Sequence, residues 1–140
     1  MTIKELSQLY WLNREIEADK KRLEELSRVA GDAGISHLTG MPHAPSSNDS
    51  KVERLVAEIT DLQAVIAAKQ IQCIHERNRL ERWINDIPDS LTRLVFRYRF
   101  INGLPWVQVA ASIGDGTSEG SVKMICHRYI KAYNRQNKQS

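Results

Sequence analysis

The sequence predicts an all-α protein, in which a long antiparallel helical hairpin or coiled coil is followed by a C-terminal helix-turn-helix module of three helices. Two long stretches, 3–30 and 51–86, repeat apolar residues at helical spacing, and no stretch alternates apolar and polar residues as a strand does. The remainder reads as short helices separated by Gly and Pro. We therefore expect two domains, 1–87 with a loop at 31–50, and 88–140.

The first helix is expected over residues 3–30, which contain neither Gly nor Pro. Asp19 interrupts one d position of its heptads. The a and d positions are otherwise apolar: Leu9, Leu12, Ile16, Leu23, Leu26 and Ala30. Glycines and prolines then predict the loop at 31–50, and Asp49 or Ser50 is the expected N-cap of the next helix.

The second helix, at about 51–86, would be a rod of roughly 50 Å. Lys69 and Glu76 are polar breaks in its heptad pattern, which is otherwise carried by Val52, Leu55, Ile59, Leu62, Ile66, Cys73, Leu80 and Trp83. Neither helix can bury its apolar stripe alone, so antiparallel pairing is expected. The pattern leaves open whether the seam closes within one chain or forms a homodimer or higher homo-oligomer.

Pro88 ends the second helix, and Asp89 or Ser90 is the expected N-cap of the next one. Pro105 suits the first turn of a helix. Short helices are expected at 91–101, 105–113 and 118–134.

The stretch "SIGDGTSEGSVKMICHR" (112–128) poses a choice between a phosphate-binding loop and the turn of a helix-turn-helix. A dinucleotide-binding fingerprint needs a preceding strand, and a Walker loop needs a Lys at its end; neither is present. Gly114 is instead placed as a left-handed cap of the helix before it, and Thr117 or Ser118 as the N-cap of the helix after it. Helical spacing predicts an inward stripe of Val122, Cys126, Tyr129 and Tyr133.

Charge is distributed unevenly along the chain. Residues 1–87 hold 12 Lys and Arg against 14 Asp and Glu, whereas residues 88–140 hold 8 against 3. The basic C-terminal third favours a polyanionic partner. No apolar run is long enough to span a membrane and no signal-peptide core is present, so we expect no membrane partner and a cytoplasmic location.

The segments "RYRFINGL", "WVQVAASIG" and "GSVKMICHR" resemble region 4 of the sigma-70 family of transcription initiation factors and the related LuxR-like helix-turn-helix. With "LYWLNREIEADKKRLEEL" and "TGMP", the whole chain is similar to small phage and prophage proteins grouped with sigma-like regulators of late genes. The resemblance implies binding to double-stranded DNA, contact with RNA polymerase and a bacterial host cell. The turn "DGTSEGS" is about two residues longer than usual, which leaves the base-contacting set open.

In a helix-turn-helix, the start of the second helix meets base edges in the major groove. By position, the candidates for base contact are Ser118, Glu119, Ser121, Lys123 and His127. The candidates for phosphate contact are Arg97, Arg99, Gln108, Thr117, Arg128, Lys131 and Arg135. For Arg97 and Arg99 the alternative is a favourable interaction with the helix dipole.

No catalytic set, metal site or cofactor is expected. His37 and His43 lie in the loop, and the Cys-His pairs near residues 73 and 126 point to different sides of their helices. The aromatic residues of the C-terminal module are expected in its core: Phe96, Tyr98, Phe100, Trp106, Tyr129 and Tyr133.

Two other functions fit the same pattern. A DNA-packaging factor like a small terminase subunit also joins a helix-turn-helix to helical oligomerisation segments. A protein that binds RNA polymerase or a host protein without binding DNA would explain Glu119 and the shortage of Arg early in the recognition helix.

Overall fold

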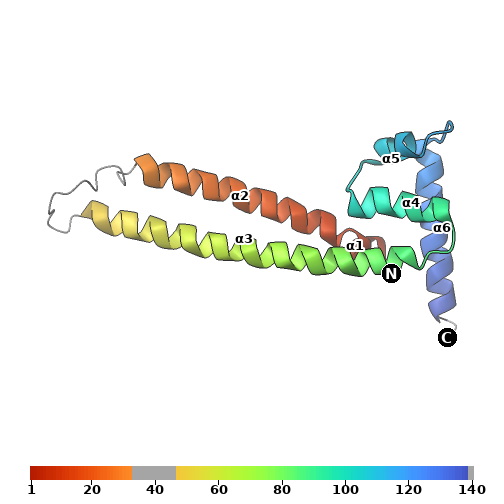
Figure 1. The fold of residues 1–140 in the computed structure, drawn as a ribbon, viewed down its shortest axis with the longest axis horizontal. Coiled ribbons are helices and arrows are strands. Elements are labelled where there is room, and N and C mark those ends of the chain that lie inside the picture. Colours follow the sequence, from red (N-terminus) through yellow and green to blue (C-terminus); the bar gives the residue numbers. More distant parts are fainter. Residues whose placement is uncertain (33–46, 139–140) are drawn as a thin grey trace. The chain divides into compact units, whose positions relative to one another are not determined.

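A computed structural model describes residues 1–32 and 47–138, and every element in these residues is helical (Figure 1). The long helices α2 and α3 pack antiparallel and are followed by shorter C-terminal helices, which confirms the predicted fold class. The elements are α1 (Ile3–Leu6), α2 (Gln8–Asp32), α3 (Ser47–Asn85), α4 (Ser90–Phe96), the π-helical segment η2 (Arg97–Ile101), α5 (Trp106–Ile113) and α6 (Glu119–Lys138).

Both long helices extend beyond their expected ends at the hairpin tip. α2 continues through Asp32 and α3 begins at Ser47, so Asp49 and Ser50 lie inside the helix and the expected capping position is wrong. Residues 33–46, with His37 and His43, lie outside the described part of the chain.

The chain forms two compact units, which we call the hairpin unit (13–72) and the terminal unit (1–12 with 73–140). The terminal unit thus includes the start of α2 and the end of α3 as well as the C-terminal helices. The predicted domain boundary between residues 87 and 88 stays a prediction.

In the hairpin unit, the heptad positions of α2 and α3 face each other within one chain. Ile16, Leu26, Ala30 and Ile66 are buried along this seam. The two polar breaks pair across it, since Lys69 Nζ donates to Asp19 Oδ2 at 2.6 Å. The apolar sides of α2 and α3 in the hairpin unit therefore cover each other within one chain.

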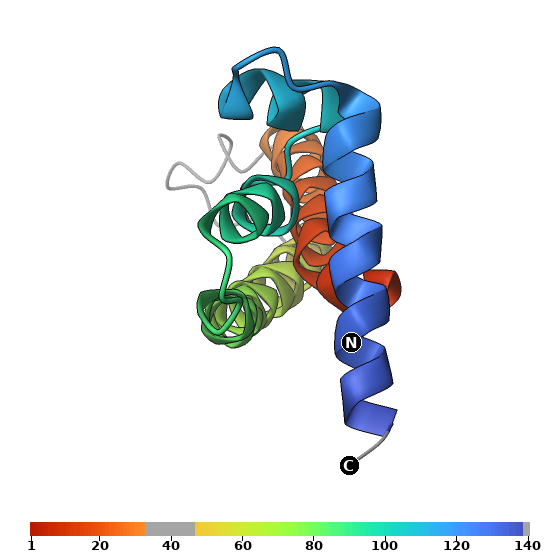
Figure 2. The same cartoon turned by 90° about the vertical axis from the view of Figure 1, so that its right-hand side faces the viewer.

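The terminal unit has two adjoining cores. The larger one joins α1 and the beginning of α2 to the end of α3 and to α4, η2 and α6, through Leu6, Leu9, Leu80, Ile84, Ile87, Phe96, Phe100, Cys126 and Ile130. The smaller one holds α4, α5 and α6 together through Val95, Val109, Ala110 and Val122. Figure 2 shows α6 alongside α4, with α5 near its N-terminal end.

Trp83 lies in an aromatic cluster within the larger core. Its ring centroid is 5.2 Å from that of Tyr133, 5.5 Å from Phe96 and 5.8 Å from Tyr129. The edge-to-face contacts with the two tyrosines are the arrangement that aromatic rings prefer. Phe96 and Phe100 are buried as expected, whereas Tyr98, Trp106 and the two tyrosines of α6 are half-buried.

The sequence "DIPDS" ends α3 and starts α4 as expected. The Asp89 carboxylate caps α4 by accepting from the Thr92 backbone N–H at 3.0 Å and from its hydroxyl at 2.7 Å. The hydroxyl bond is the main reason that the pKa of Asp89 is lowered. The predicted helix 91–101 is α-helical only to Phe96 and continues as η2, where Asn102 N–H donates to Arg97 O at 3.0 Å.

Among the described residues, no helix combines the length and the apolar character that crossing a bilayer requires.

Candidate nucleic-acid interface

The turn between α5 and α6 has an unusual backbone. Three successive residues have positive φ: Gly114 at 78°, Asp115 at 53° and Gly116 at 71°. The ψ of Gly114 is −157°, an extended conformation that is essentially restricted to glycine, rather than the left-handed helical cap that was expected. Thr117 N–H donates to Gly114 O at 3.0 Å and closes the turn.

Ser118 caps α6. Its hydroxyl accepts from the Ser121 backbone N–H at 3.1 Å, and its carbonyl accepts from Val122 N–H at 3.2 Å. This satisfies one of the free N–H groups that every helix start exposes. α6 therefore begins at Glu119, one residue later than expected, and it continues to Lys138.

The inward side of α6 follows the predicted stripe in part. Val122 and Cys126 are fully buried, whereas Tyr129 and Tyr133 are half-buried. Ile130, which the predicted stripe did not include, is 8% exposed. Burial raises the pKa of the Cys126 thiol to about 12. Cys126 is thus a packing residue in a protonated state at neutral pH.

The opposite side of α6, which we call the outward face, consists of Gly120, Met124, His127, Arg128, Lys131 and Arg135. All six residues are exposed, and their spacing of three, four and seven residues places them on one side of a helix. Met124 is 51% exposed near the start of this face. A methyl group built on Gly120 would meet nothing within 4 Å, so this position is open to solvent.

The base-contact candidates all lie in the first half of α6 or just before it, but they differ in what they already contact. Lys123 Nζ lies 2.9 Å from Glu119 Oε1, so these two opposite charges form an ion pair. Ser118 is committed to capping, while Ser121 and His127 have exposed side chains.

The phosphate-contact candidates of α6 form the C-terminal part of the outward face. Arg128, Lys131 and Arg135 are exposed, and α6 carries one acidic residue, Glu119. Gln108 is exposed on α5, whereas Thr117 is half-buried in the turn. The C-terminal half of α6 therefore presents positive charge with no acidic residue of its own to offset it.

Arg97 and Arg99 have different surroundings. Arg99 Nη1 donates to Leu104 O at 3.1 Å, and the Arg99 guanidinium lies 4.6 Å from the centre of the Trp106 ring. These contacts fasten η2 to the segment that leads into α5. The side chain of Arg97 is 41% exposed, and its Nη1 lies 3.9 Å from Glu81 Oε1.

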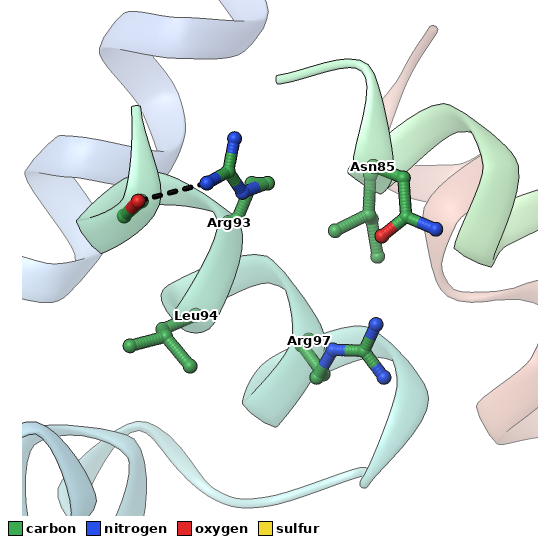
Figure 3. Close-up of a pocket in the computed structure, with 6 residues that line it drawn as sticks. Asn85, Arg93, Leu94 and Arg97 are labelled. Carbon is green, nitrogen blue, oxygen red and sulfur yellow. Dashed lines mark hydrogen bonds between the residues drawn. The ribbon is translucent and has the colours of Figure 1, made fainter. Parts of the chain in front are cut away.

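Arg97 also lines a shallow pocket of about 270 Å³ between the end of α3 and α4 (Figure 3). Arg93 and Leu94 of α4 and Asn85 of α3 are the other side chains labelled there. Arg93 supports the interhelix turn, since it donates to Ile87 O at 2.7 Å and to Ser90 Oγ at 2.8 Å. The pocket thus carries two guanidinium groups, one of which is already hydrogen-bonded.

Sequence reasoning missed Met124 and Lys138 on α6 and Arg93 on α4. The signal for Met124 was present, because the buried stripe of α6 fixes which residues lie opposite to it. Polar side chains were the expected base contacts, and the exposed apolar Met124 was therefore not among them.

Comparison of the chain with protein-family models, with curated proteins and with solved structures found no match. Within residues 1–32 and 47–138, no three His, Cys, Asp or Glu side chains gather in a way that could hold a metal ion.

Proposed function

We propose that the chain is a sequence-specific, phage-type regulator of transcription that binds double-stranded DNA in the cytoplasm of a bacterial host. In this proposal α5 is the scaffold helix and α6 is the recognition helix of a helix-turn-helix. The long hairpin would serve in self-association or in docking a partner, for which RNA polymerase is our candidate.

The observation that carries the proposal is the outward face of α6. A helix of 20 residues, roughly 30 Å long, presents one side without acidic residues, and three of the six residues of that side are Arg or Lys. The positive-φ turn separates it from α5, and the buried stripe fixes its orientation in the terminal unit. An exposed helix of this kind fits the width of the major groove of B-DNA.

The contacts divide by position along α6. Lys123 and Met124 lie near its start, where a recognition helix meets base edges, and the open position at Gly120 allows close approach. Arg128, Lys131 and Arg135 lie further along and suit phosphate contacts, which add affinity without sequence choice. Because Arg99 is hydrogen-bonded within the unit, we assign it mainly a structural role.

Selection from a random duplex library tests the proposal. The full-length chain is used to enrich bound fragments, and their affinity is then measured by fluorescence anisotropy between about 50 and 200 mM salt. We expect an enriched motif and a Kd that weakens steeply with salt. Absence of enrichment together with no binding at about 50 mM salt would overturn the proposal.

Matched variants localise the contact. Arg128→Ala or Lys131→Ala should weaken binding to every sequence and reduce the salt slope by about one. Lys123→Ala should change the enriched motif itself. Lys21→Ala, which removes an exposed Lys from α2, should leave Kd and slope unchanged.

A protein-binding function without DNA contact is the second candidate. The Glu119–Lys123 ion pair favours it, because it neutralises the charge at the start of the recognition helix. The pocket beside Arg97 and Leu94 offers both charge and apolar surface to a protein partner. Failure of DNA selection, combined with co-purification of RNA polymerase from a bacterial lysate, would favour this function.

A further inference from the structure

The pocket between the end of α3 and α4 combines hydrogen-bond donors with an apolar side. Ile84, which is 1% exposed, forms its buried apolar side. Figure 3 shows the polar groups of Asn85, Arg93 and Arg97 around the pocket. The six described residues that line it include no carboxylate: Ile84, Asn85, Ser90, Arg93, Leu94 and Arg97. The pocket therefore offers positive charge and donor groups to a ligand.

The chain itself uses these donors only in part. In the described part of the chain, the side chains of Asn85 and Arg97 make no hydrogen bond, and Arg97 Nη1 lies 3.9 Å from Glu81 Oε1. Ser90 Oγ accepts from Arg93 at 2.8 Å, which leaves the Ser90 hydroxyl hydrogen available. These groups can therefore bind an external acceptor without breaking an internal hydrogen bond.

Arg93 is held in place before any ligand binds. Its Nη1 donates to Ile87 O at 2.7 Å, and its Nη2 donates to Ser90 Oγ at 2.8 Å. A side chain that is already ordered loses little conformational freedom on binding. The charge of Arg93 is thus fixed beside the pocket, and Arg97, whose side chain is 41% exposed, supplies a second guanidinium.

Two leucines of α4 extend the pocket into an apolar surface. Leu94 lines the pocket and is 42% exposed, and Leu91, three residues earlier, is 43% exposed. Residues three apart on a helix are neighbours. A partner that fills the pocket can therefore cover leucine surface and contact the guanidinium groups at the same time.

The size and the surroundings of the pocket favour a protein side chain as its ligand. Its volume of about 270 Å³ is below the range of roughly 300–1,000 Å³ that is typical of small-molecule sites. Asp86 and Asp89 in the turn from α3 to α4, and Glu81 near Arg97, limit the positive charge to the pocket itself. A DNA backbone is charged along its whole length and would meet these carboxylates.

We propose that the pocket binds the carboxylate of an Asp or Glu in a protein partner, within a segment whose apolar residues cover Leu91 and Leu94. A guanidinium matches the planar geometry of a carboxylate and can bind it through two parallel hydrogen bonds. Arg97, a candidate for phosphate contact by sequence, serves protein docking in this proposal. The proposal deepens the protein-binding function named above and does not rest on DNA binding by α6.

Selection from a library of random displayed peptides tests the proposal. The full-length chain is the bait, and the Kd of each enriched peptide is measured by fluorescence anisotropy at about 0.15 M salt, where distant charges are screened. We expect enriched peptides to carry Asp or Glu beside Leu, Ile or Phe.

Variants of the chain localise the peptide contact. Arg97→Glu should weaken binding at least about tenfold, because it brings like charges together. Leu94→Ser should also weaken binding, with unchanged circular dichroism. Arg28→Glu makes the same change of charge at an exposed position of α2 and should leave the Kd unchanged.

An exchange of charge separates loss of the contact from loss of the fold. A peptide whose acidic residue is replaced by Lys should bind Arg97→Glu more tightly than it binds the native chain. A variant that is merely destabilised would bind neither peptide better than the native chain does.

The proposal would be overturned if no peptide is enriched, if the enriched peptides lack acidic residues, or if both Arg97→Glu and Leu94→Ser leave the Kd unchanged. Weaker binding of duplex DNA by Arg97→Glu, without any peptide binding, would instead assign the pocket to the DNA contact. Peptide binding is measured without DNA, so its outcome is separate from that of the DNA selection.

Discussion

Asp19 and Lys69 meet across the seam of the hairpin unit, with 2.6 Å between Oδ2 and Nζ. Each occupies a heptad position where its helix lacks an apolar residue, and each side chain keeps about a quarter of its exposure. A paired polar break of this kind specifies helix register, at a cost in stability relative to apolar packing.

The first prediction follows from this pair. Asp19→Leu should lower the melting temperature, because it leaves the Lys69 ammonium against apolar surface. Adding Lys69→Leu should raise it above the native value, since two leucines pack without desolvating charge. Thermal melts by far-UV circular dichroism measure both, and equal melting temperatures for the single and double variants would contradict the interaction.

The same pair gives a pH dependence. The hydrogen bond from Lys69 to Asp19 raises the pKa of Lys69 above its ordinary value of 10.5. Because the pKa of Lys69 is raised in the folded chain, its ion pair with Asp19 stabilises the fold at neutral pH. This stabilisation is lost as the pH rises through the raised pKa of Lys69. The difference in melting temperature between the native chain and Asp19→Leu should therefore shrink above pH 10.5.

The second prediction separates Arg97 from Arg99. Arg99→Ala should lower the free energy of unfolding by about 1–2 kcal/mol, because it removes the bond to Leu104 O and the contact with the Trp106 ring. Arg99→Lys should recover only part of this, since an ammonium lacks the planar fork of a guanidinium. Arg97→Ala should change the value by less than about 0.5 kcal/mol, because the Arg97 side chain is 41% exposed and its ion pair with Glu81 is long, at 3.9 Å. Urea titrations followed by circular dichroism give these values.

The third prediction concerns the two thiols. Burial raises the pKa of Cys126 to about 12, so at pH near 8 its reactive thiolate is scarce and covered. Iodoacetamide should label the half-buried Cys73 in the native chain and reach Cys126 only after unfolding in guanidinium. Peptide mass spectrometry identifies the labelled residue, and rapid native labelling of Cys126 would show that the core opens readily.

The fourth prediction assigns a role to Met124 within the proposed DNA contact. An exposed apolar side chain near the start of a recognition helix suits the methyl group of thymine. Duplexes from the enriched pool that are resynthesised with deoxyuridine should bind several-fold more weakly. Met124→Ala should bind both versions equally. Equal binding of the two pools by the native chain would exclude a methyl contact while leaving DNA binding itself intact.

The long helices were predictable because seven-residue periodicity specifies both the helix and its buried side. Ile16 and Ile66 lie where the pattern places them. The pattern could not show that Asp19 meets Lys69, because that pairing depends on the register of the two helices, which seven-residue periodicity does not specify. It also could not predict η2, since helical spacing alone does not distinguish a π-helical turn from an α-helical one.

For the candidate site, spacing predicted the buried Val122 and Cys126 of α6 but missed the buried Ile130, and the outward face lies opposite to these residues. The ion pair of Glu119 with Lys123 could also be anticipated, since residues four apart on a helix are neighbours. The conformation of Gly114 could not be anticipated. Several turns with positive φ can connect two helices, and the sequence of the turn does not specify which one forms.

The aromatic cluster around Trp83 has a consequence for spectroscopy. All nine Trp, Tyr and Phe residues of the chain belong to the terminal unit, and residues 13–72 contain none. Intrinsic fluorescence therefore reports on the terminal unit alone, whereas far-UV circular dichroism averages over both. The two signals can therefore be compared during unfolding without any added label. If they change together, the two units unfold as one; if they change separately, the units unfold independently.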